Sequence, residues 1–307
     1  MLFNNNCIVV LGPTASGKTR LACRLAYQLN GEIISADSRQ VYKHLNLGTG
    51  KDLGEYVVNG HQIPYHLIDI CEPSEQFFLH QFIKELEKSF SYVLSRKKMP
   101  VICGGTGMYL DALRKDFSFT QIEENDDLRR ELNELSKEEL LLRIQHFPNE
   151  LTNHVDLNSK KRIIRGIEVA DYRTKNNFFT TQSELPYKPL YIGISLNNEE
   201  RKKRISERLK QRLNDGLVEE VESLINNGLS HQRLEILGLE YKFVSLFLEG
   251  KISKEGLTTQ LQTAIFQFAK RQMTWFRKME KEGVKINWVS TDYKIEEIIK
   301  SLKHFVH

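Results

Sequence analysis

The sequence predicts an α/β fold in which a parallel sheet, flanked by helices, carries an all-helical insertion. Short apolar runs rich in β-branched residues recur at residues 7–11, 32–35, 65–69, 100–103 and 190–194. Amphipathic helical stretches separate most of these runs, and such alternation is typical of parallel strands joined by helices. A third observation is the change of character between residues 117 and 187, where strand patterns give way to charged helical stretches at 126–142 and 159–172. We expect a core of residues 1–116 and 188–307 and an insertion of residues 117–187.

Length and composition bound the class of protein. The 307 residues are 40% hydrophobic and 27% charged, which is ordinary for a water-soluble protein, and they suffice for one large α/β domain with an insertion. No apolar run approaches the length that spans a bilayer, and no basic segment followed by an apolar one marks the N-terminus. The four cysteines lack metal-ligand spacing. We expect a monomeric cytoplasmic protein with reduced thiols and no membrane partner.

Residues 12–19 carry the strongest local signal. They read Gly-Pro-Thr-Ala-Ser-Gly-Lys-Thr and match the phosphate-loop pattern G-x-x-x-x-G-K-[ST]. The first apolar run precedes them, and a helix with Leu21, Leu25 and Leu29 on one face follows. In such a loop the backbone N–H groups and the lysine bind phosphate, and the hydroxyl of Thr19 is placed to hold Mg²⁺. The sequence therefore predicts a P-loop NTPase-like core. Its candidate diphosphate-binding residues are Gly12, Thr14, Ala15, Ser16, Gly17, Lys18 and Thr19.

Two further side chains are expected beside the loop. Asp37 follows the second apolar run, and ligands in open parallel sheets lie beyond the carboxyl ends of the strands. A carboxylate at that place is a candidate general base. Thr106 follows two glycines at the end of the fourth run, which permit close approach of a ligand but fit a plain turn equally well. A phosphate loop alone does not distinguish a kinase, an ATPase and a transferase.

Basic residues are clustered although the formal net charge is only +4. The dense segments are 160–165, 201–204 and 270–278. Each alone is typical of a solvated helix face, but three of them in a phosphate-binding protein favour a nucleic-acid partner. Arg204, Arg208 and Arg212 also recur along the apolar edge of one helix, so that one of them can be aimed at buried phosphate.

Five motifs follow one another along the chain outside the insertion. They are residues 12–19, Ala-Asp-Ser-Arg-Gln-Val-Tyr at 36–42, His-Leu-Ile-Asp at 66–69, Gly-Gly-Thr-Gly-Met-Tyr at 104–109 and Ala-Lys-Arg-Gln-Met-Thr-Trp-Phe-Arg at 269–277. In order and spacing they resemble the signatures of the tRNA dimethylallyltransferase (IPP transferase) family. The resemblance implies a core whose helical insertion clamps the anticodon stem-loop of tRNA. It also implies transfer of a dimethylallyl group from dimethylallyl diphosphate to N6 of the adenosine immediately 3′ of the anticodon, with release of diphosphate.

The resemblance implies roles for individual residues. Asp37 would take the proton from adenosine N6, and Thr106 would line the reaction channel. Arg208, with the phosphate loop and Mg²⁺ near Thr19, would stabilise the departing diphosphate. The residues expected to contact tRNA are Asp37, Ser38, Arg39, Gln40, Thr106, Arg129, Lys161, Arg162, Ile163, Ile164, Arg165, Lys270, Arg271 and Arg277.

The chain departs from the family pattern in two places. Residues 238–242 read Gly-Leu-Glu-Tyr-Lys where many bacterial members have Gly-Tyr-Arg-Gln, and residues 48–52 read Gly-Thr-Gly-Lys-Asp where the family has Gly-Thr-Ala-Lys-Pro. Other functions stay open. An isopentenyltransferase acting on free adenine nucleotides would use the same loop and base without an insertion that grips tRNA. A small-molecule P-loop kinase would need ATP and an arginine-bearing lid. A non-catalytic tRNA-binding protein would transfer nothing.

Overall fold

The computed structural model describes residues 5–153, 155–176 and 184–306. The chain divides into two compact units, a core unit of Met1–Arg114 with Pro186–His307 and a helical unit of Lys115–Leu185. In the described residues, no helix is both long enough and apolar enough to cross a bilayer.

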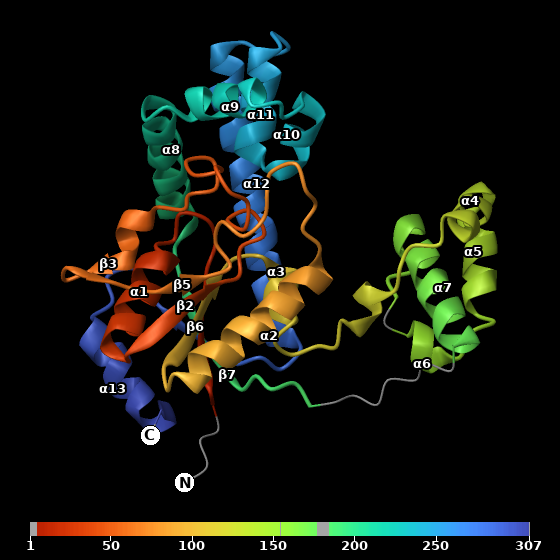
Figure 1. Ribbon diagram of the computed structural model, residues 1–307, viewed down its shortest axis with the longest axis horizontal. Helices are drawn as coiled ribbons and strands as arrows, with labels where there is room; N and C mark the ends of the chain where they lie inside the picture. Colours follow the sequence, from red (N-terminus) through yellow and green to blue (C-terminus); the bar gives the residue numbers. More distant parts are fainter. Residues whose placement is uncertain (1–4, 154, 177–183, 307) are drawn as a thin grey trace. The chain divides into compact units, whose positions relative to one another are not determined.

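A six-stranded parallel sheet forms the centre of the core unit (Figure 1). Its strands have the order β5-β2-β6-β1-β7-β8, and every neighbouring pair is parallel. The bounds are β1 Cys7–Leu11, β2 Gly31–Ser35, β5 Tyr65–His66, β6 Met99–Gly104, β7 Pro189–Ile194 and β8 Ile286–Val289. The predicted parallel α/β core is thereby confirmed. Because β6 lies between β1 and β2, the turns that follow these three strands meet at one edge of the sheet.

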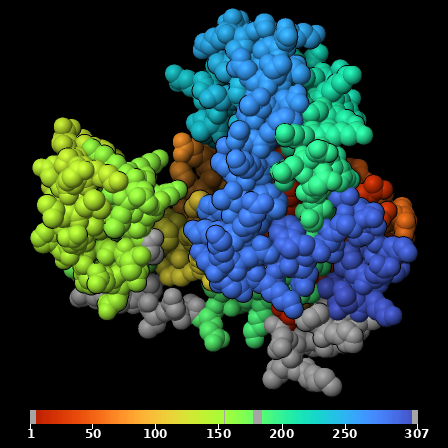
Figure 2. Space-filling model, turned by 180° about the vertical axis from the view of Figure 1, so that it is seen from behind, coloured from red at the N-terminus to blue at the C-terminus, as the bar shows by residue number. Residues whose placement is uncertain are grey.

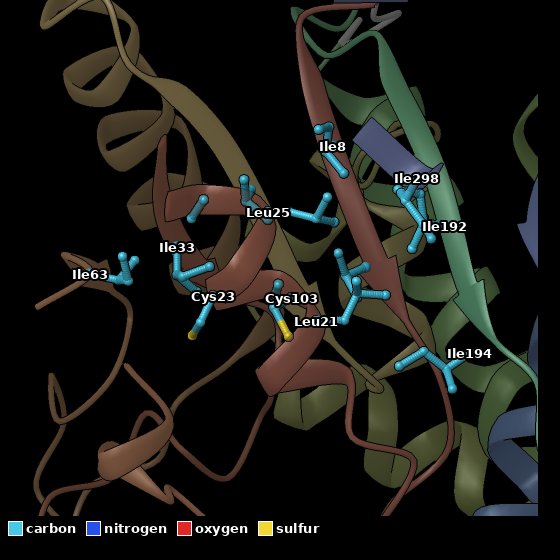
Figure 3. Packing of buried hydrophobic residues seen from close by; sticks show 14 of the residues in the cluster. Ile8, Leu21, Cys23, Leu25, Ile33, Ile63, Cys103, Ile192, Ile194 and Ile298 are labelled. Carbon is cyan, nitrogen blue, oxygen red and sulfur yellow. The ribbon is translucent and has the colours of Figure 1, made fainter. Parts of the chain in front are cut away.

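The sheet is buried because its strands are apolar on both faces. All five residues of β1 are buried, and helix α1 (Lys18–Gln28) packs on the sheet through Leu21 and Leu25. Figure 3 shows these leucines beside Ile8 and Ile192 of the sheet. Helix α13 (Ile295–Val306) joins the same apolar cluster. The remaining elements near the sheet are α2 (Leu79–Ser95), α3 (Gly107–Asp111), the 3₁₀ turn η1 (Leu53–Tyr56) and the hairpin of β3 (Val57–Val58) and β4 (His61–Gln62).

Five further helices form a second apolar cluster in the core unit. They are α8 (Asn198–Asn214), α9 (Leu217–Asn226), α10 (His231–Leu237), α11 (Leu239–Leu248) and α12 (Lys254–Lys281). Buried side chains such as Leu209, Val221, Tyr241 and Leu261 hold them together. Helix α12 is long enough to extend from this cluster down to the turn after β6, where it contacts α3 (Figure 1). The second cluster therefore covers the edge of the sheet at which the three turns meet.

The helical unit contains η2 (Ser118–Gln121), α4 (Asp126–Glu134), α5 (Lys137–Ile144), α6 (Asn149–Thr152) and α7 (Lys160–Lys175). Its core is apolar and includes Leu132, Leu140 and Ile167. The single helix predicted at 126–142 is two helices, because Leu135 is extended and Ser136 caps α5 through a hydrogen bond from the Glu139 amide.

One predicted strand is shorter than expected. The run at residues 65–69 forms a strand only at Tyr65–His66. Leu67 and Asp69 have φ values of 60° and 57°, in the left-handed region, so the backbone leaves the sheet after His66. Asp69 is thereby turned toward the loop of residues 46–52 rather than toward the phosphate loop.

Candidate functional site

The phosphate loop forms a ring of backbone donors at the N-terminus of α1. Ala15 and Gly17 have φ values of 60° and 84°, and alternation of left-handed and right-handed residues curls successive N–H groups toward one point. The Ser16 amide donates to the Pro13 carbonyl at 3.2 Å. Among the described residues, no backbone hydrogen bond outside the helices and strands is donated by four amides of this segment, those of Ala15, Gly17, Lys18 and Thr19. This arrangement, with the positive end of the helix dipole, suits an anion.

Gln272 of α12 fixes the phosphate loop to the turn after β6. Its side-chain oxygen accepts the Thr14 amide at 2.8 Å, and its side-chain nitrogen donates to the Gly105 carbonyl at 2.9 Å. The residue is only 7% exposed, so both bonds are shielded from water. The amide of Thr14 is therefore directed at the protein, and the remaining loop amides are the ones that face a ligand.

Gln272 is not among the site residues expected from the sequence, where only Lys270, Arg271 and Arg277 of its motif are assigned a role. A signal was nevertheless present. Gln272 lies three residues after Ala269 and four before Phe276, on the buried stripe of α12. A lone amide among apolar positions of one helix face indicates a buried polar group with specific partners.

The turns after β2 and β6 bring Asp37 and Thr106 together. The Ala36 amide donates to the Cys103 carbonyl at 2.8 Å, and the Ser38 amide donates to the Thr106 hydroxyl oxygen at 3.1 Å. Asp37 is half-buried, and its Oδ1 accepts the Arg39 amide at 2.9 Å. Its Oδ2 has no hydrogen-bond partner among the described residues. One carboxylate oxygen is thus held in place and the other is free to accept a proton.

The loop of residues 46–52 closes another side of the site and is anchored by two charged side chains, the half-buried Glu220 and the buried Lys51. The carboxylate of Glu220 accepts the amides of Asn46, Leu47 and Gly48 at 2.8–3.2 Å, and the hydroxyl of Tyr241 at 2.7 Å. These five groups come from three separate segments, so the loop cannot move without breaking several hydrogen bonds.

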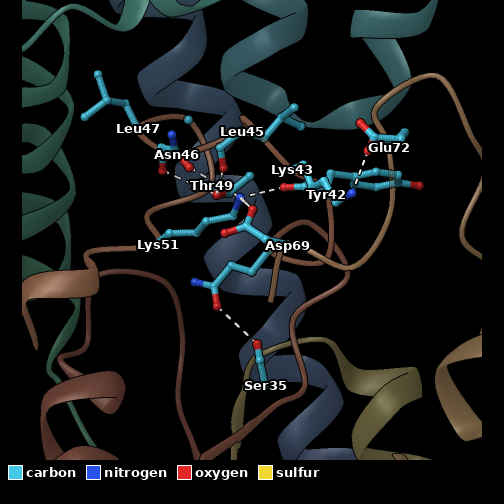
Figure 4. A network of polar contacts seen from close by, with 12 residues as sticks. Ser35, Tyr42, Lys43, Leu45, Asn46, Leu47, Thr49, Lys51, Asp69 and Glu72 are labelled. Atoms are coloured by element: carbon cyan, nitrogen blue, oxygen red, sulfur yellow. Dashed lines mark hydrogen bonds and ion pairs between the residues drawn. The ribbon is translucent and has the colours of Figure 1, made fainter. Parts of the chain in front are cut away.

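Lys51 is the second anchor of that loop. It is 2% exposed, donates to the Tyr42 carbonyl at 2.5 Å and forms an ion pair with Asp69 (Figure 4). Burial lowers the pKa of Lys51, while the Asp69 carboxylate opposes that shift.

Gln40, which is expected from the sequence to contact tRNA, has its side chain bonded within the protein. It accepts the Ser35 hydroxyl and donates to the Gly50 carbonyl, both at 3.1 Å.

A pocket lies between the phosphate loop and the second helical cluster. Its polar wall comes from Thr14, Arg208, Arg212 and Glu240, and its other side from Ala15 and three apolar side chains, Ile205, Leu209 and Ile265. Arg208, a candidate from the sequence for binding buried phosphate, therefore lines the same pocket as Thr14 and Ala15 of the phosphate loop. Charged and apolar side chains thus meet beside the phosphate loop.

The residues expected to contact tRNA separate into two groups in the helical unit. Arg129 makes two hydrogen bonds of 2.8 Å to the buried carboxylate of Glu168. Arg165 donates to the Ile122 carbonyl at 2.6 Å and lies 3.4 Å from Glu168. Ile163 and Ile164 are buried in the core of this unit. These four side chains hold the unit together, whereas Lys161 and Arg162 are exposed and Arg162 pairs with Asp156.

The basic residues of α12 lie on its outer side. Lys270, Arg271 and Arg277 are exposed, and the Arg271 guanidinium lies 5.9 Å from the centre of the Phe268 ring. Figure 2 shows α12 as a long blue ridge on one face of the core unit. Arg39 is also exposed and donates to the Ile236 carbonyl at 2.6 Å. The core unit thus presents cations on its surface as well as inside its site.

Comparison with known proteins identifies the family. A family model described as IPP transferase matches residues 40–279, and one described as isopentenyl transferase matches residues 5–64. The chain belongs to the IPP transferase family. Among relatives, it is 44% identical over 301 residues to tRNA dimethylallyltransferase 2 of Phocaeicola vulgatus, covering 98% of this chain and 97% of that one. It is 47% identical over 290 residues to tRNA dimethylallyltransferase 2 of Shewanella sediminis, covering 93% of each.

A solved structure extends the likeness to the fold. The tRNA delta(2)-isopentenylpyrophosphate transferase of Staphylococcus epidermidis superposes with a TM-score of 0.67 at 32% identity, covering 97% of this chain and 98% of that one. The IPP transferase relatives thus match both units of this chain along nearly their full lengths.

Proposed function

We propose that this protein is a tRNA dimethylallyltransferase, which moves a dimethylallyl group from dimethylallyl diphosphate to N6 of the adenosine immediately 3′ of the anticodon. The observation that carries the proposal is the meeting of an anion-binding loop with a carboxylate, Asp37, that keeps one oxygen free. Relatives that bear this name at 44–47% identity over nearly the whole chain support it.

The proposed reaction needs a base and a stabilised leaving group. The lone pair of an adenine amine is conjugated with the ring, so the amine attacks well only as its proton is removed. The bond from N6 to C1 of the allyl group forms, the bond from C1 to the diphosphate oxygen breaks, and Asp37 takes the proton. Negative charge develops on the departing diphosphate, and it is stabilised by the loop amides together with Lys18 and Arg208. The Thr106 hydroxyl oxygen accepts a hydrogen bond from the Ser38 amide at 3.1 Å and so positions the turn that carries Asp37.

The residues around Thr19 fit Mg²⁺ bound together with the substrate. Among the described residues no group of three His, Cys, Asp or Glu side chains could hold a metal ion by itself. Mg²⁺ in phosphate sites characteristically takes one or two protein oxygens and completes its shell with phosphate and water. The half-buried Thr19 hydroxyl, at the start of α1, is such an oxygen. When bound, Mg²⁺ neutralises charge on the diphosphate.

We further propose that tRNA is bound by its phosphates through exposed cations of both units. Lys161 and Arg162 in the helical unit, and Lys270, Arg271 and Arg277 in the core unit, are available for such contacts. The target base must leave the stack of the anticodon loop to reach Asp37, as in other enzymes that modify bases. We place this activity in the cytoplasm and assign it to a monomer.

One experiment separates the proposal from its rivals. The protein is mixed with radiolabelled dimethylallyl diphosphate and, in parallel, with bulk tRNA, AMP or ATP. Label is expected on tRNA alone. Label on AMP or ATP in place of tRNA would identify a transferase for free nucleotides. In a parallel mixture with ATP labelled at the γ-phosphate, movement of that label to another molecule without prenyl transfer would identify a kinase. No transfer to any acceptor would leave a tRNA-binding protein and would overturn the proposal.

A further inference from the structure

A second arginine, Arg212, lies beside the proposed diphosphate site without a close partner. Its side chain is only 8% exposed, and its Nη2 has no hydrogen-bond acceptor among the described residues. The nearest carboxylates, of Glu240 and Asp52, lie at 3.8 and 3.9 Å from its guanidinium nitrogens, which is too far for a hydrogen bond. Burial of a guanidinium is costly unless its N–H groups are bonded, so this group requires an acceptor that the protein itself does not supply.

Arg208 and Arg212 converge on a single point. Both Nη2 atoms reach the backbone of Gly50 so closely that a Cβ at that position would overlap each of them. Gly50 has a φ of 65°, which also favours glycine. Arg208 itself has no hydrogen bond or ion pair within the described part of the chain. Two cations therefore face the same space; Arg208 has no anionic partner among the described residues, and Arg212 has only the two carboxylates at 3.8 and 3.9 Å.

The charge of Arg212 is maintained at neutral pH. Burial, reinforced by repulsion from Arg208, lowers the pKa of Arg212 to about 10. Glu240 and Asp52 act in the opposite direction and make the guanidinium tolerable in the free protein. Both arginines line the same pocket as Thr14 and Ala15 of the phosphate loop. The pocket thus places two arginines, neither of which has a hydrogen-bonded anion among the described residues, beside two residues of the phosphate loop.

We propose that Arg212 is a second diphosphate-binding arginine, which together with Arg208 binds the phosphate oxygens that the loop amides leave free. This inference rests on the proposed function and extends it to a residue one helical turn further along α8. Glu240 holds the Arg212 side chain at 3.8 Å in the free protein and yields it to the phosphate when diphosphate enters. Gly50 leaves the space that both guanidinium groups need.

The test is the affinity of the full chain for inorganic pyrophosphate, measured by titration calorimetry in the presence of Mg²⁺. Arg212→Met should weaken binding about ten- to hundredfold, the range for loss of a charge-assisted hydrogen bond. Arg212→Lys keeps the positive charge but not the planar guanidinium, so its pyrophosphate affinity should fall by less than that of Arg212→Met. Arg204→Met is the matched control, because Arg204 lies on the same helix and pairs with Glu200 at 2.6 Å; its affinity should be unchanged.

Glu240→Gln distinguishes binding from a structural ion pair. If Arg212 serves diphosphate, removal of the competing carboxylate should leave pyrophosphate affinity equal to or above that of the native protein. If the Arg212–Glu240 pair only holds α8 against α11, Arg212→Met and Glu240→Gln should both lower the unfolding temperature while pyrophosphate affinity stays native. That result would overturn the inference. Should Arg212→Met fail to fold, Gly50→Ala tests the same contact, because it displaces both guanidinium groups without removing a charge.

Failure of this inference differs from failure of the proposed function. If native protein prenylates tRNA and Arg212→Met has native pyrophosphate affinity, only the role of Arg212 is wrong. If native protein binds pyrophosphate and prenylates nothing, the proposed function fails while the second arginine stands.

Discussion

Replacement of Gln272 by methionine should damage both the stability and the catalysis of this protein. The side chain makes two buried hydrogen bonds, to the Thr14 amide and the Gly105 carbonyl. Methionine fills nearly the same volume but bonds neither group. Each buried donor or acceptor left unpaired costs about 1–3 kcal/mol, so the two together cost about 2–6 kcal/mol. Because burial of the apolar thioether offsets part of this cost, we expect the free energy of unfolding to fall by about 2–4 kcal/mol.

Prenyl transfer should slow in Gln272→Met because the phosphate loop is no longer held in place against the turn after β6. Without Gln272, nothing else described on α12 ties the phosphate loop to the turn that carries Thr106. A shift of about 1 Å between reacting groups lowers rates by about a hundredfold. We therefore expect single-turnover prenyl transfer to fall by one to two orders of magnitude. The affinity for tRNA should change little, since the exposed face of α12 is untouched.

The assay compares three variants by thermal unfolding and by single-turnover transfer of labelled dimethylallyl groups to tRNA. Gln267→Met is the matched control, because Gln267 is exposed on the same helix. Gln272→Glu still accepts the Thr14 amide but sets a carboxylate against the Gly105 carbonyl, so it should be worse than methionine. If Gln272→Met matches Gln267→Met in both measurements, the role assigned to this bridge is refuted.

Three further predictions concern other parts of the chain. Lys161→Gln combined with Arg162→Gln should lower the log–log slope of tRNA affinity against salt by about 0.7–0.9 for each lost phosphate contact; filter binding at several salt concentrations checks this, and an unchanged slope would assign these charges to a solvated face. Arg208→Ala should lower kcat about a hundredfold and raise the KM for dimethylallyl diphosphate; steady-state kinetics that instead show only weaker tRNA binding would contradict its place at the diphosphate. Burial raises the pKa of Cys71 to about 11, so at pH 8 this thiol stays protonated and should react with a disulfide reagent far more slowly in the native than in the unfolded chain; equal rates would contradict its burial.

The parts of the fold that could be predicted are those determined by residues close to one another in the sequence. The strand, loop and helix of residues 7–28 each carry their own pattern, because β-branched runs, the glycines of the loop and a four-residue leucine repeat act over one or two turns. The place of Asp37 also follows from local information. It comes directly after a strand, and all parallel strands end at the same edge.

What the sequence left undecided depends on partners far along the chain. Arg165 was expected on the surface with Lys161, but Glu168 on the buried side of α7 and the Ile122 carbonyl draw it inward. The sequence shows the charge of Arg165 and cannot show which acceptor it will meet. Similarly, Gln272 and Thr14 are 258 positions apart, and only the tertiary fold selects that pair.

The loop of residues 46–52 illustrates the same limit. Its composition departs from the family pattern, yet Glu220 and Lys51 anchor it firmly. The departures at positions 50, 52 and 240 fall beside one another, around Arg212. Substitutions that look unrelated in the sequence thus belong to one charged cluster in the structure.

Transfer by an Asp37→Asn variant tests the central claim most directly. Native protein and variant are incubated with dimethylallyl diphosphate and tRNA, and the tRNA is digested to nucleosides and analysed by mass spectrometry. Native protein should yield N6-dimethylallyladenosine. The variant should bind tRNA and pyrophosphate normally but transfer at least about a hundredfold more slowly, since asparagine cannot take the proton. Near-native transfer by the variant would contradict the assignment of Asp37 as the base at the edge of the sheet.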